Sequence, residues 1–185
     1  MQATTGTPLT DEADPAPGRP GGSDRRLLVV LTAVALVAYL LDQVTKWWAQ
    51  RSLVVGVPRP LIGDLVRLDL THNAGAAFSV GTGYTILLTG VALAVVVSCL
   101  RLARRLGSTG WAVALGLLLG GALGNVTDRM VRSPGPLRGH VVDFVRLPDW
   151  PVFNLADASI CIAAAMVVLL SVRGVRFDGS RGHAD

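Results

Sequence analysis

Four aspartates at the edges of apolar runs are the residues of this chain best suited to chemistry. They are Asp42, Asp128, Asp143 and Asp157. An ionised carboxylate beside hydrocarbon is costly, by roughly 3 kcal/mol at the centre of a membrane-spanning helix. We therefore expect some of the four to serve in catalysis or ion movement. Asp143 in "VVDF" and Asp157 in "FNLAD" look like a catalytic pair. Two carboxylates held close together cannot both ionise easily, so such a pair shares one proton.

Other polar residues stand at helical spacing around these aspartates. Asp42 and Lys46 are four residues apart, so they share a helix face and can pair. The pair is either an interfacial ion pair that fixes the end of the first helix or a support for an active site. Asn125, Asp128 and Arg129 also share a face. Taken alone, they indicate a polar helix end with a local Asp128–Arg129 pair.

Two further motifs allow two interpretations each. Asn154 precedes Asp157 by three residues, so the two share a face. They are either site residues or an N-cap with an acid favoured by the helix dipole. The run "NAGAAF", which contains Asn73 and Gly75, has small side chains that allow close approach. The approaching group is either another helix or an extended peptide.

The composition indicates which elements position these residues. Of the 185 residues, 51% are hydrophobic and 16% are charged, whereas a soluble domain has about a quarter charged. The apolar residues form four runs, each near the ~20 residues of a spanning helix. The predicted spans are 27–48, 84–102, 107–128 and 153–172. The first and fourth reach this length only if Asp42 and Asp157 lie at the membrane edge.

Four spans place both termini on one side of the membrane. The arginines on that side crowd close to helix ends, which indicates the cytoplasm; they are Arg25, Arg26, Arg101, Arg104, Arg105, Arg173 and Arg176. Residues 1–24 are polar and rich in Pro and Gly, so we predict a disordered cytoplasmic tail. The domain is then 25–174, followed by a second cytoplasmic tail at 175–185.

The outer loops, 49–83 and 129–152, contain basic residues interleaved with acids. In Val66–Thr71, apolar and polar residues alternate, which predicts a strand with one buried face. Leu53–Val55 is a second candidate strand, and Pro58, Pro60 and Gly63–Asp64 supply turns. The predicted fold class is therefore an all-α membrane protein with four spanning helices and a small extracytoplasmic sheet.

Several function classes fit these patterns poorly. The basic residues form no stripe, which argues against nucleic-acid binding. Two isolated cysteines and three scattered histidines are too few for a cysteine-based zinc site. An ion-coupled transporter predicts acids near mid-span and paired repeats, but here the acids cluster at one end. A non-catalytic assembly protein would not need two acids in one site.

Five motifs in order resemble one family. The runs "DQVTK", "NAGAAF", "GGALGNVTDR", "VVDF" and "FNLADASI" are similar to those of lipoprotein signal peptidase (signal peptidase II). Each motif alone is weak, but the ordered set is specific. The resemblance extends from Asp42 to Ile160.

The resemblance implies a bacterial inner-membrane aspartic endopeptidase. Members remove the signal peptide of a prolipoprotein whose cysteine carries diacylglycerol, and they cut just before that cysteine. The resemblance implies Asp143 and Asp157 as the catalytic pair, an outer β-cradle, and neither cofactor nor metal. It implies diacylglyceryl-prolipoproteins and membrane lipids as partners, and we expect a monomer. Supporting or substrate-contacting positions are Asp42, Lys46, Asn73, Gly75, Asn125, Asp128, Arg129 and Asn154.

Overall fold

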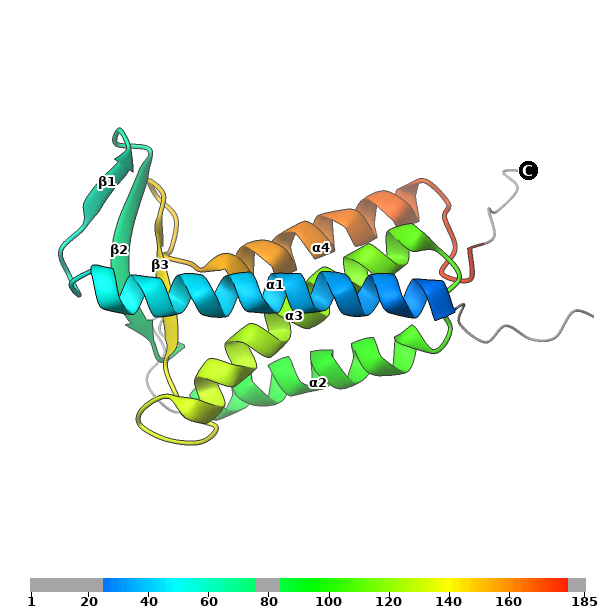
Figure 1. The fold of residues 1–185 in the computed structure, drawn as a ribbon, viewed down its shortest axis with the longest axis horizontal. Helices are drawn as coiled ribbons and strands as arrows, with labels where there is room; N and C mark the ends of the chain where they lie inside the picture. The colour runs from blue at the N-terminus through cyan, green and yellow to red at the C-terminus, as the bar shows by residue number, and fades with distance from the viewer. Residues whose placement is uncertain (1–24, 76–83, 180–185) are drawn as a thin grey trace, which may run out of the picture.

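Four long helices form the body of the molecule (Figure 1). The structure is a computed structural model that describes residues 25–75 and 84–179. The predicted tail at 1–24 and Ala76–Phe78 of the "NAGAAF" run lie outside the described residues. The helices are α1 (Arg25–Ser52), α2 (Thr85–Ala103), α3 (Thr109–Val131) and α4 (Leu155–Val172).

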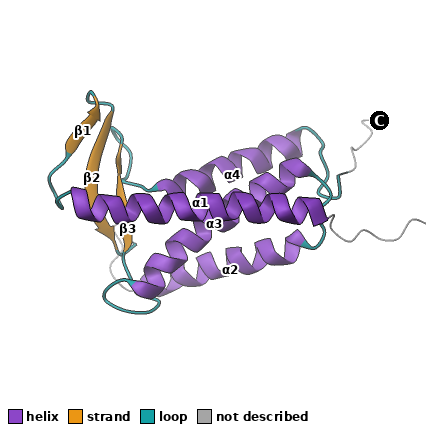
Figure 2. Cartoon of the chain, in the orientation of Figure 1, coloured by secondary structure: helices purple, strands orange, loops and turns teal. Residues whose placement is uncertain are grey.

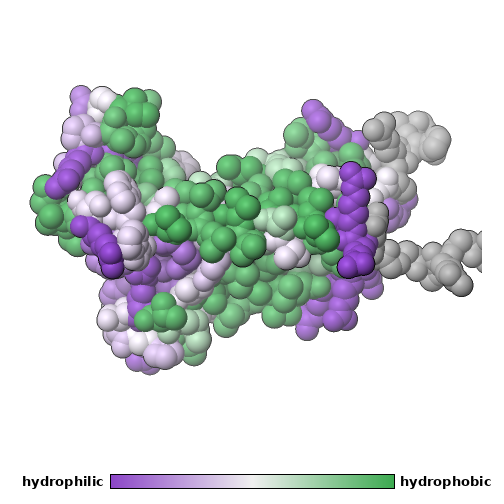
Figure 3. Space-filling view, viewed as in Figure 1, coloured by the Kyte–Doolittle hydropathy of each residue, from purple (hydrophilic) through white to green (hydrophobic). Residues whose placement is uncertain are grey.

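Each of these helices is long and apolar enough to cross a membrane. In the space-filling view, hydrophobic residues cover the middle of the bundle and hydrophilic residues gather towards its two ends (Figure 3). The prediction of four spans is therefore confirmed. Helices α1 and α3 each continue about one turn beyond their predicted ends, to Ser52 and Val131.

Helix α3 is central and packs against the other three helices. Its glycines allow this close approach. A Cβ atom added at Gly120 would lie 2.5 Å from the carbonyl oxygen of Ala35 on α1. One added at Gly121 would lie 2.6 Å from the carbonyl oxygen of Ala156 on α4. The glycine-rich motif thus brings the middle of α1 and the start of α4 close to α3.

A three-stranded antiparallel sheet lies at one end of the bundle, called here the sheet end (Figure 2). Its order is β1 (Arg59–Ile62), β2 (Val66–Asn73) and β3 (Val141–Arg146). The strand predicted at Val66–Thr71 is confirmed as part of β2. The prediction of a strand at Leu53–Val55 is wrong, because Leu53 N still donates to Ala49 O at the end of α1.

The first strand is instead β1, which contains Pro60, a residue predicted to lie in a turn. Proline has no N–H to donate, and an edge strand needs no donor on its outer side. The turn predicted at Gly63–Asp64 is confirmed between β1 and β2.

Two apolar clusters lie on either side of the polar site. One joins the end of α1 to the sheet and consists of Ala49, Leu53, Leu70, Val142 and Phe144. The other fills the opposite end of the bundle, and its buried residues include Leu31, Ala35, Cys99, Ala112 and Leu115.

The first residues of the predicted C-terminal tail pack against this opposite end. Trp111 Nε1 donates to the carbonyl oxygen of Val175 at 2.9 Å. The ring of Phe177 packs against that of Trp111 in a tilted arrangement, with 5.3 Å between centroids. Both described ends of the chain therefore lie away from the sheet end (Figure 1).

Candidate active site

Strand β3 places Asp143 at the sheet end with only 1% of its surface exposed. Asn73 Nδ2 donates to its Oδ2 at 2.9 Å, and Asn154 Nδ2 donates to its Oδ1 at 2.6 Å. Burial raises the pKa of Asp143 to about 7, and the neighbouring carboxylate of Asp157 adds to the rise. The two amide hydrogen bonds oppose it. Asp143 can therefore hold a proton near neutral pH.

Asp157 lies in the first turn of α4 and is partly exposed. Its Oδ1 accepts from Asn125 Nδ2 at 2.8 Å, and its Oδ2 accepts from the backbone N of Asn154 at 3.3 Å. Asp157 N donates in return to Asn154 Oδ1 at 2.9 Å, which completes a capping box. The N-cap interpretation is thus confirmed, and it is compatible with a role in a site because Asn154 also contacts Asp143.

The structure brings the two predicted catalytic carboxyls together around Asn154. One is buried and able to hold a proton, while the other is partly open to solvent. Such a pair can take a proton from water with one member and donate a hydrogen bond to a reacting oxygen with the other.

Lys46 is fully buried at the back of this pair. Its Nζ lies 2.8 Å from Asp42 Oδ2, 2.9 Å from Asp128 Oδ2 and 3.0 Å from Asn125 Oδ1. These three acceptors match the three hydrogens of an ammonium group. The other oxygen of Asp42 accepts from the backbone N of Ala156 on α4 at 2.9 Å. The predicted Asp42–Lys46 pair is confirmed, and both side chains are fully buried within the protein.

The predicted Asp128–Arg129 pair is wrong. Asp128 pairs instead with Lys46 and with Arg132, whose Nε lies 2.5 Å from Asp128 Oδ1. It also accepts from the backbone N of Val142 at 3.2 Å. Consecutive residues of a helix point in different directions, whereas residues four apart share a face. The spacing of Asp128 and Arg132 was therefore the signal that the sequence offered.

Arg129 lies near the carboxyls of Asp143, Asp128 and Asp157, without forming an ion pair with Asp128. Its side chain is nearly buried, at 7% exposure. Its Nη1 has no hydrogen-bond partner among the residues that the structure describes. A buried donor without a partner is costly, so this group is suited to a carbonyl oxygen supplied by a ligand.

Gly75 contacts the side chain of Asn73 at the edge of the site. Its φ of +107° is a conformation that only glycine adopts without strain. Its backbone N donates to Asn73 Oδ1 at 2.7 Å. Glycine is therefore needed at position 75 because the chain turns there, and this turn orients the amide of Asn73.

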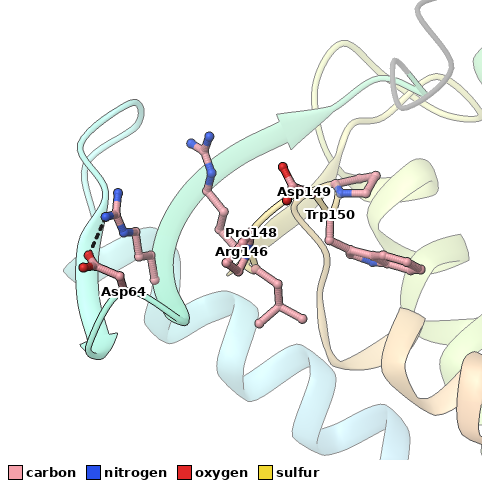
Figure 4. Close-up of a pocket in the computed structure, with 8 residues that line it drawn as sticks. Asp64, Arg146, Pro148, Asp149 and Trp150 are labelled. Carbon is pink, nitrogen blue, oxygen red and sulfur yellow. Dashed lines mark hydrogen bonds and ion pairs between the residues drawn. The ribbon is translucent and has the colours of Figure 1, made fainter.

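No group of three or more His, Cys, Asp or Glu is placed to hold a metal ion in residues 25–75 and 84–179. A separate cavity of about 570 Å³ lies between the β1–β2 turn and residues 147–151 (Figure 4). Its arginines are already paired: Arg67 with Asp64 at 2.6 Å and Arg146 with Asp69 at 2.9 Å. None of the predicted site residues lines this cavity.

Residues 34–173 match the family model of "Signal peptidase (SPase) II". The chain belongs to the signal peptidase II family. It is therefore a peptidase, embedded in the membrane by four apolar helices. All the predicted site residues, from Asp42 to Asp157, lie inside the matched segment.

Relatives named "Lipoprotein signal peptidase" are similar over nearly the whole chain. The one from Mycobacterium avium (strain 104) is 51% identical over 177 residues, which cover 91% of this chain and 97% of that relative. The one from Mycobacterium tuberculosis (strain H37Rv) is 50% identical over 178 residues, covering 95% and 88%.

Two solved structures described as a bacterial membrane enzyme share the fold of this signal peptidase II. One has a TM-score of 0.70 at 24% identity and covers 83% of this chain and 97% of that one. The other has a TM-score of 0.71 at 22% identity and covers 89% and 98%. The arrangement of four helices and a small sheet is therefore a shared fold.

Proposed function

We propose that this signal peptidase II removes signal peptides from lipoprotein precursors whose cysteine carries diacylglycerol. The cut falls immediately before that cysteine. Two things support the substrate class: the names of the relatives and the five motifs found in the sequence. The observation that carries the chemistry is the joining of Asp143 and Asp157 by Asn154, at the end of an apolar bundle.

In this proposal Asp143 and Asp157 form the catalytic pair. Asp143 holds the shared proton because it is the more deeply buried member. Asp157 takes a proton from water, and the resulting hydroxide attacks the scissile carbonyl carbon. Asp143 donates a hydrogen bond to the oxyanion that forms. When the peptide C–N bond breaks, the proton held by Asp157 passes to the leaving amine of the cysteine.

The surrounding polar groups orient the substrate and the pair. The unpartnered Nη1 of Arg129 is available to a substrate carbonyl oxygen. The amides of Asn73, Asn125 and Asn154 hold the carboxylates by donating to their oxygens. Lys46 supports these groups through two buried ion pairs. Its pair with Asp42 lies within α1, and its pair with Asp128 joins α1 to α3.

The proposed location is the bacterial inner membrane, with both termini in the cytoplasm and the sheet end outside. The arginines near the ends of α1, α2 and α4 favour this orientation. The acyl chains of the substrate then remain in the bilayer while the scissile bond reaches water. We propose a monomer that acts without nucleic acid, since both carboxyls and their donors come from one chain.

Cleavage of a purified diacylglyceryl precursor tests this function. The matched control is the same precursor without the lipid. Each buried CH₂ of an acyl chain contributes about 0.8 kcal/mol to binding, so we expect the lipid-free precursor to be cut at least ~10-fold more slowly at equal concentration. Mass spectrometry should show a product that begins with the lipid-modified cysteine. Equal rates on both precursors, or a cut elsewhere, would contradict the proposal.

A further inference from the structure

Arg132 lies outside all five motifs, yet it joins the two helices that carry the buried ion pairs. It follows α3 directly, and its side chain is 20% exposed. Its Nε donates to Asp128 Oδ1 at 2.5 Å. Its Nη1 donates to Gln50 Oε1 near the end of α1. One guanidinium therefore holds a buried carboxylate and the neighbouring helix at once.

Asp128 transmits this contact towards the catalytic pair. The carboxylate is fully buried and divides its two oxygens between different partners. Oδ2 accepts from Lys46 and from the backbone N of Val142, the residue before Asp143 on β3. Arg132 is the donor to Oδ1. The orientation of Asp128, and with it the anchoring of β3 next to Asp143, depends on both sets of donors.

Arg132 also balances the charge behind the pair. The network contains the carboxylates of Asp42 and Asp128 and the ammonium of Lys46. Arg132 supplies the second positive charge. Without it, the groups of Asp42, Asp128 and Lys46 would together carry one net negative charge next to the carboxyls of Asp143 and Asp157. Arg129, which also lies near Asp128 and the pair, contributes a positive charge that is the same with or without Arg132. A nearby like charge disfavours ionisation of a carboxyl group.

We propose that Arg132 is a positioning residue for the catalytic pair, which acts through Asp128 to hold β3 in place and to neutralise the charge behind Asp143. The inference rests on the proposed function, because it assigns a role in the same reaction. Arg132 itself contacts neither carboxyl of the pair in the described contacts. The competing interpretation is a clamp between α1 and α3 that contributes to stability alone.

The surroundings of Arg132 make the two interpretations separable. Its side chain and Gln50 line a cavity of about 430 Å³, together with His72, Ser133 and His140. Val131, also at this cavity, is 74% exposed. Water can therefore reach the position in a variant and replace a lost hydrogen bond, but it cannot replace the charge.

The experiment compares Arg132→Met, Arg132→Gln and Arg132→Lys on the lipidated precursor. The matched control is Arg138→Met, an exposed arginine of the loop between α3 and β3. The measurements are kcat, KM, the pH dependence of kcat/KM and the melting temperature. His72 and His140 face the same cavity, and Lys46 and Arg129 flank the pair. These four charged or titratable residues are present in every variant, so differences between the variants report the effect of position 132 alone.

We expect Arg132→Met and Arg132→Gln to lower kcat about 10-fold or more, as a small misplacement of reacting groups does, with KM within about 3-fold of wild type. The acid limb of the pH profile should move to higher pH in both, because the pair becomes harder to ionise. Arg132→Lys should restore the acid limb and most of kcat. Arg138→Met should match wild type.

A lower melting temperature with unchanged kcat and an unchanged acid limb would overturn the inference in favour of the clamp. An Arg132→Met variant with the kcat, the pH profile and the melting temperature of wild type would also overturn the inference. If Arg132→Met does not fold, Arg132→Gln decides between the two interpretations. Failure of the wild-type enzyme to cut the lipidated precursor would instead refute the proposed function, which distinguishes the two failures.

Discussion

The two ends of the helical bundle reach full burial by different means. At the end opposite the sheet, Ala112 on α3 is 0% exposed because small and branched apolar side chains fill the space. At the sheet end, Lys46 and Asp128 are also 0% exposed, but they are charged. Apolar packing depends on shape alone, whereas a buried charge depends on the number and direction of its partners.

Because of this difference, we expect substitutions at the two ends to have different effects. A substitution at the apolar end changes the volume of side chains, and we expect it to alter the free energy of unfolding. A substitution at the sheet end removes a hydrogen-bond partner or a charge, and we expect it to alter catalysis as well. Substitutions at each end test this contrast.

The largest expected effect is on catalysis, from removal of either proposed catalytic carboxyl. Asp143→Asn and Asp157→Asn should each lower kcat by at least ~10³-fold. The melting temperature in detergent should stay close to that of wild type or rise, because the amide carries no charge to desolvate. Turnover and thermal melts on the same preparations provide the check. Near-normal turnover by either variant would show that the pair is misassigned.

Asp128→Asn should act mainly on stability. The change leaves Arg132 without a carboxylate partner and leaves Lys46 with Asp42 alone, and breaking a buried ion pair on one side costs about 3–5 kcal/mol. Activity per folded molecule should fall only partially, in contrast to Asp143→Asn. A variant with normal melting and no turnover, beside an active Asp143→Asn, would place the catalytic role on Asp128.

The sequence allowed prediction of the parts of this molecule that depend on local pattern. The apolar runs predicted the four helices, and alternation predicted the strand that became β2. The spacing of Asn154 and Asp157 also allowed an N-cap at Asn154 to be proposed, as one of two interpretations. These features depend on residues close in sequence, so their physical causes can be identified without a structure.

Features set by distant contacts could not be predicted in this way. Pro60 lies in a strand because β1 is an edge, which is decided by the order of the sheet. Asp128 pairs with Lys46 because α1 and α3 pack closely. The unpartnered Nη1 of Arg129 becomes apparent only when its surroundings are known.

The third prediction concerns the pH dependence of stability. Burial raises the pKa of Asp143 from 3.8 to about 7. The folded protein therefore keeps a proton that the unfolded chain loses near pH 4, so stability decreases as pH rises towards 7 and the loss is complete above it. Between pH 5.5 and pH 7 the decrease is roughly 2 kcal/mol.

Thermal melts across this range, on wild type and Asp143→Asn, test the prediction. The variant has no group at position 143 to titrate, so its melting temperature should depend less on pH. The histidines are common to both proteins and cancel in the comparison. Parallel pH profiles for the two proteins would show that Asp143 does not titrate in this range.

The smallest expected effect is at the helix contact on the apolar side of the ion pairs. In Gly120→Ala, the new Cβ would lie 2.5 Å from Ala35 O and 2.8 Å from Ala38 Cβ, so α1 and α3 must move apart. Overpacking costs about 1–3 kcal/mol, and the better helix propensity of alanine offsets up to ~1 kcal/mol of this. We expect a net loss of about 1 kcal/mol.

Gly90→Ala on α2 is the matched control, because a Cβ atom added there would meet nothing within 4 Å in the described part of the chain, apart from its own stretch of helix. It should leave the melting temperature unchanged or slightly raised. Neither variant should change kcat per folded molecule, since neither removes a partner of the polar network. If Gly120→Ala lowered kcat without lowering the melting temperature, shape at the helix contact would control the position of Asp42 and Lys46. The contrast between the two ends would then fail, because packing along α1 would act directly on the chemistry.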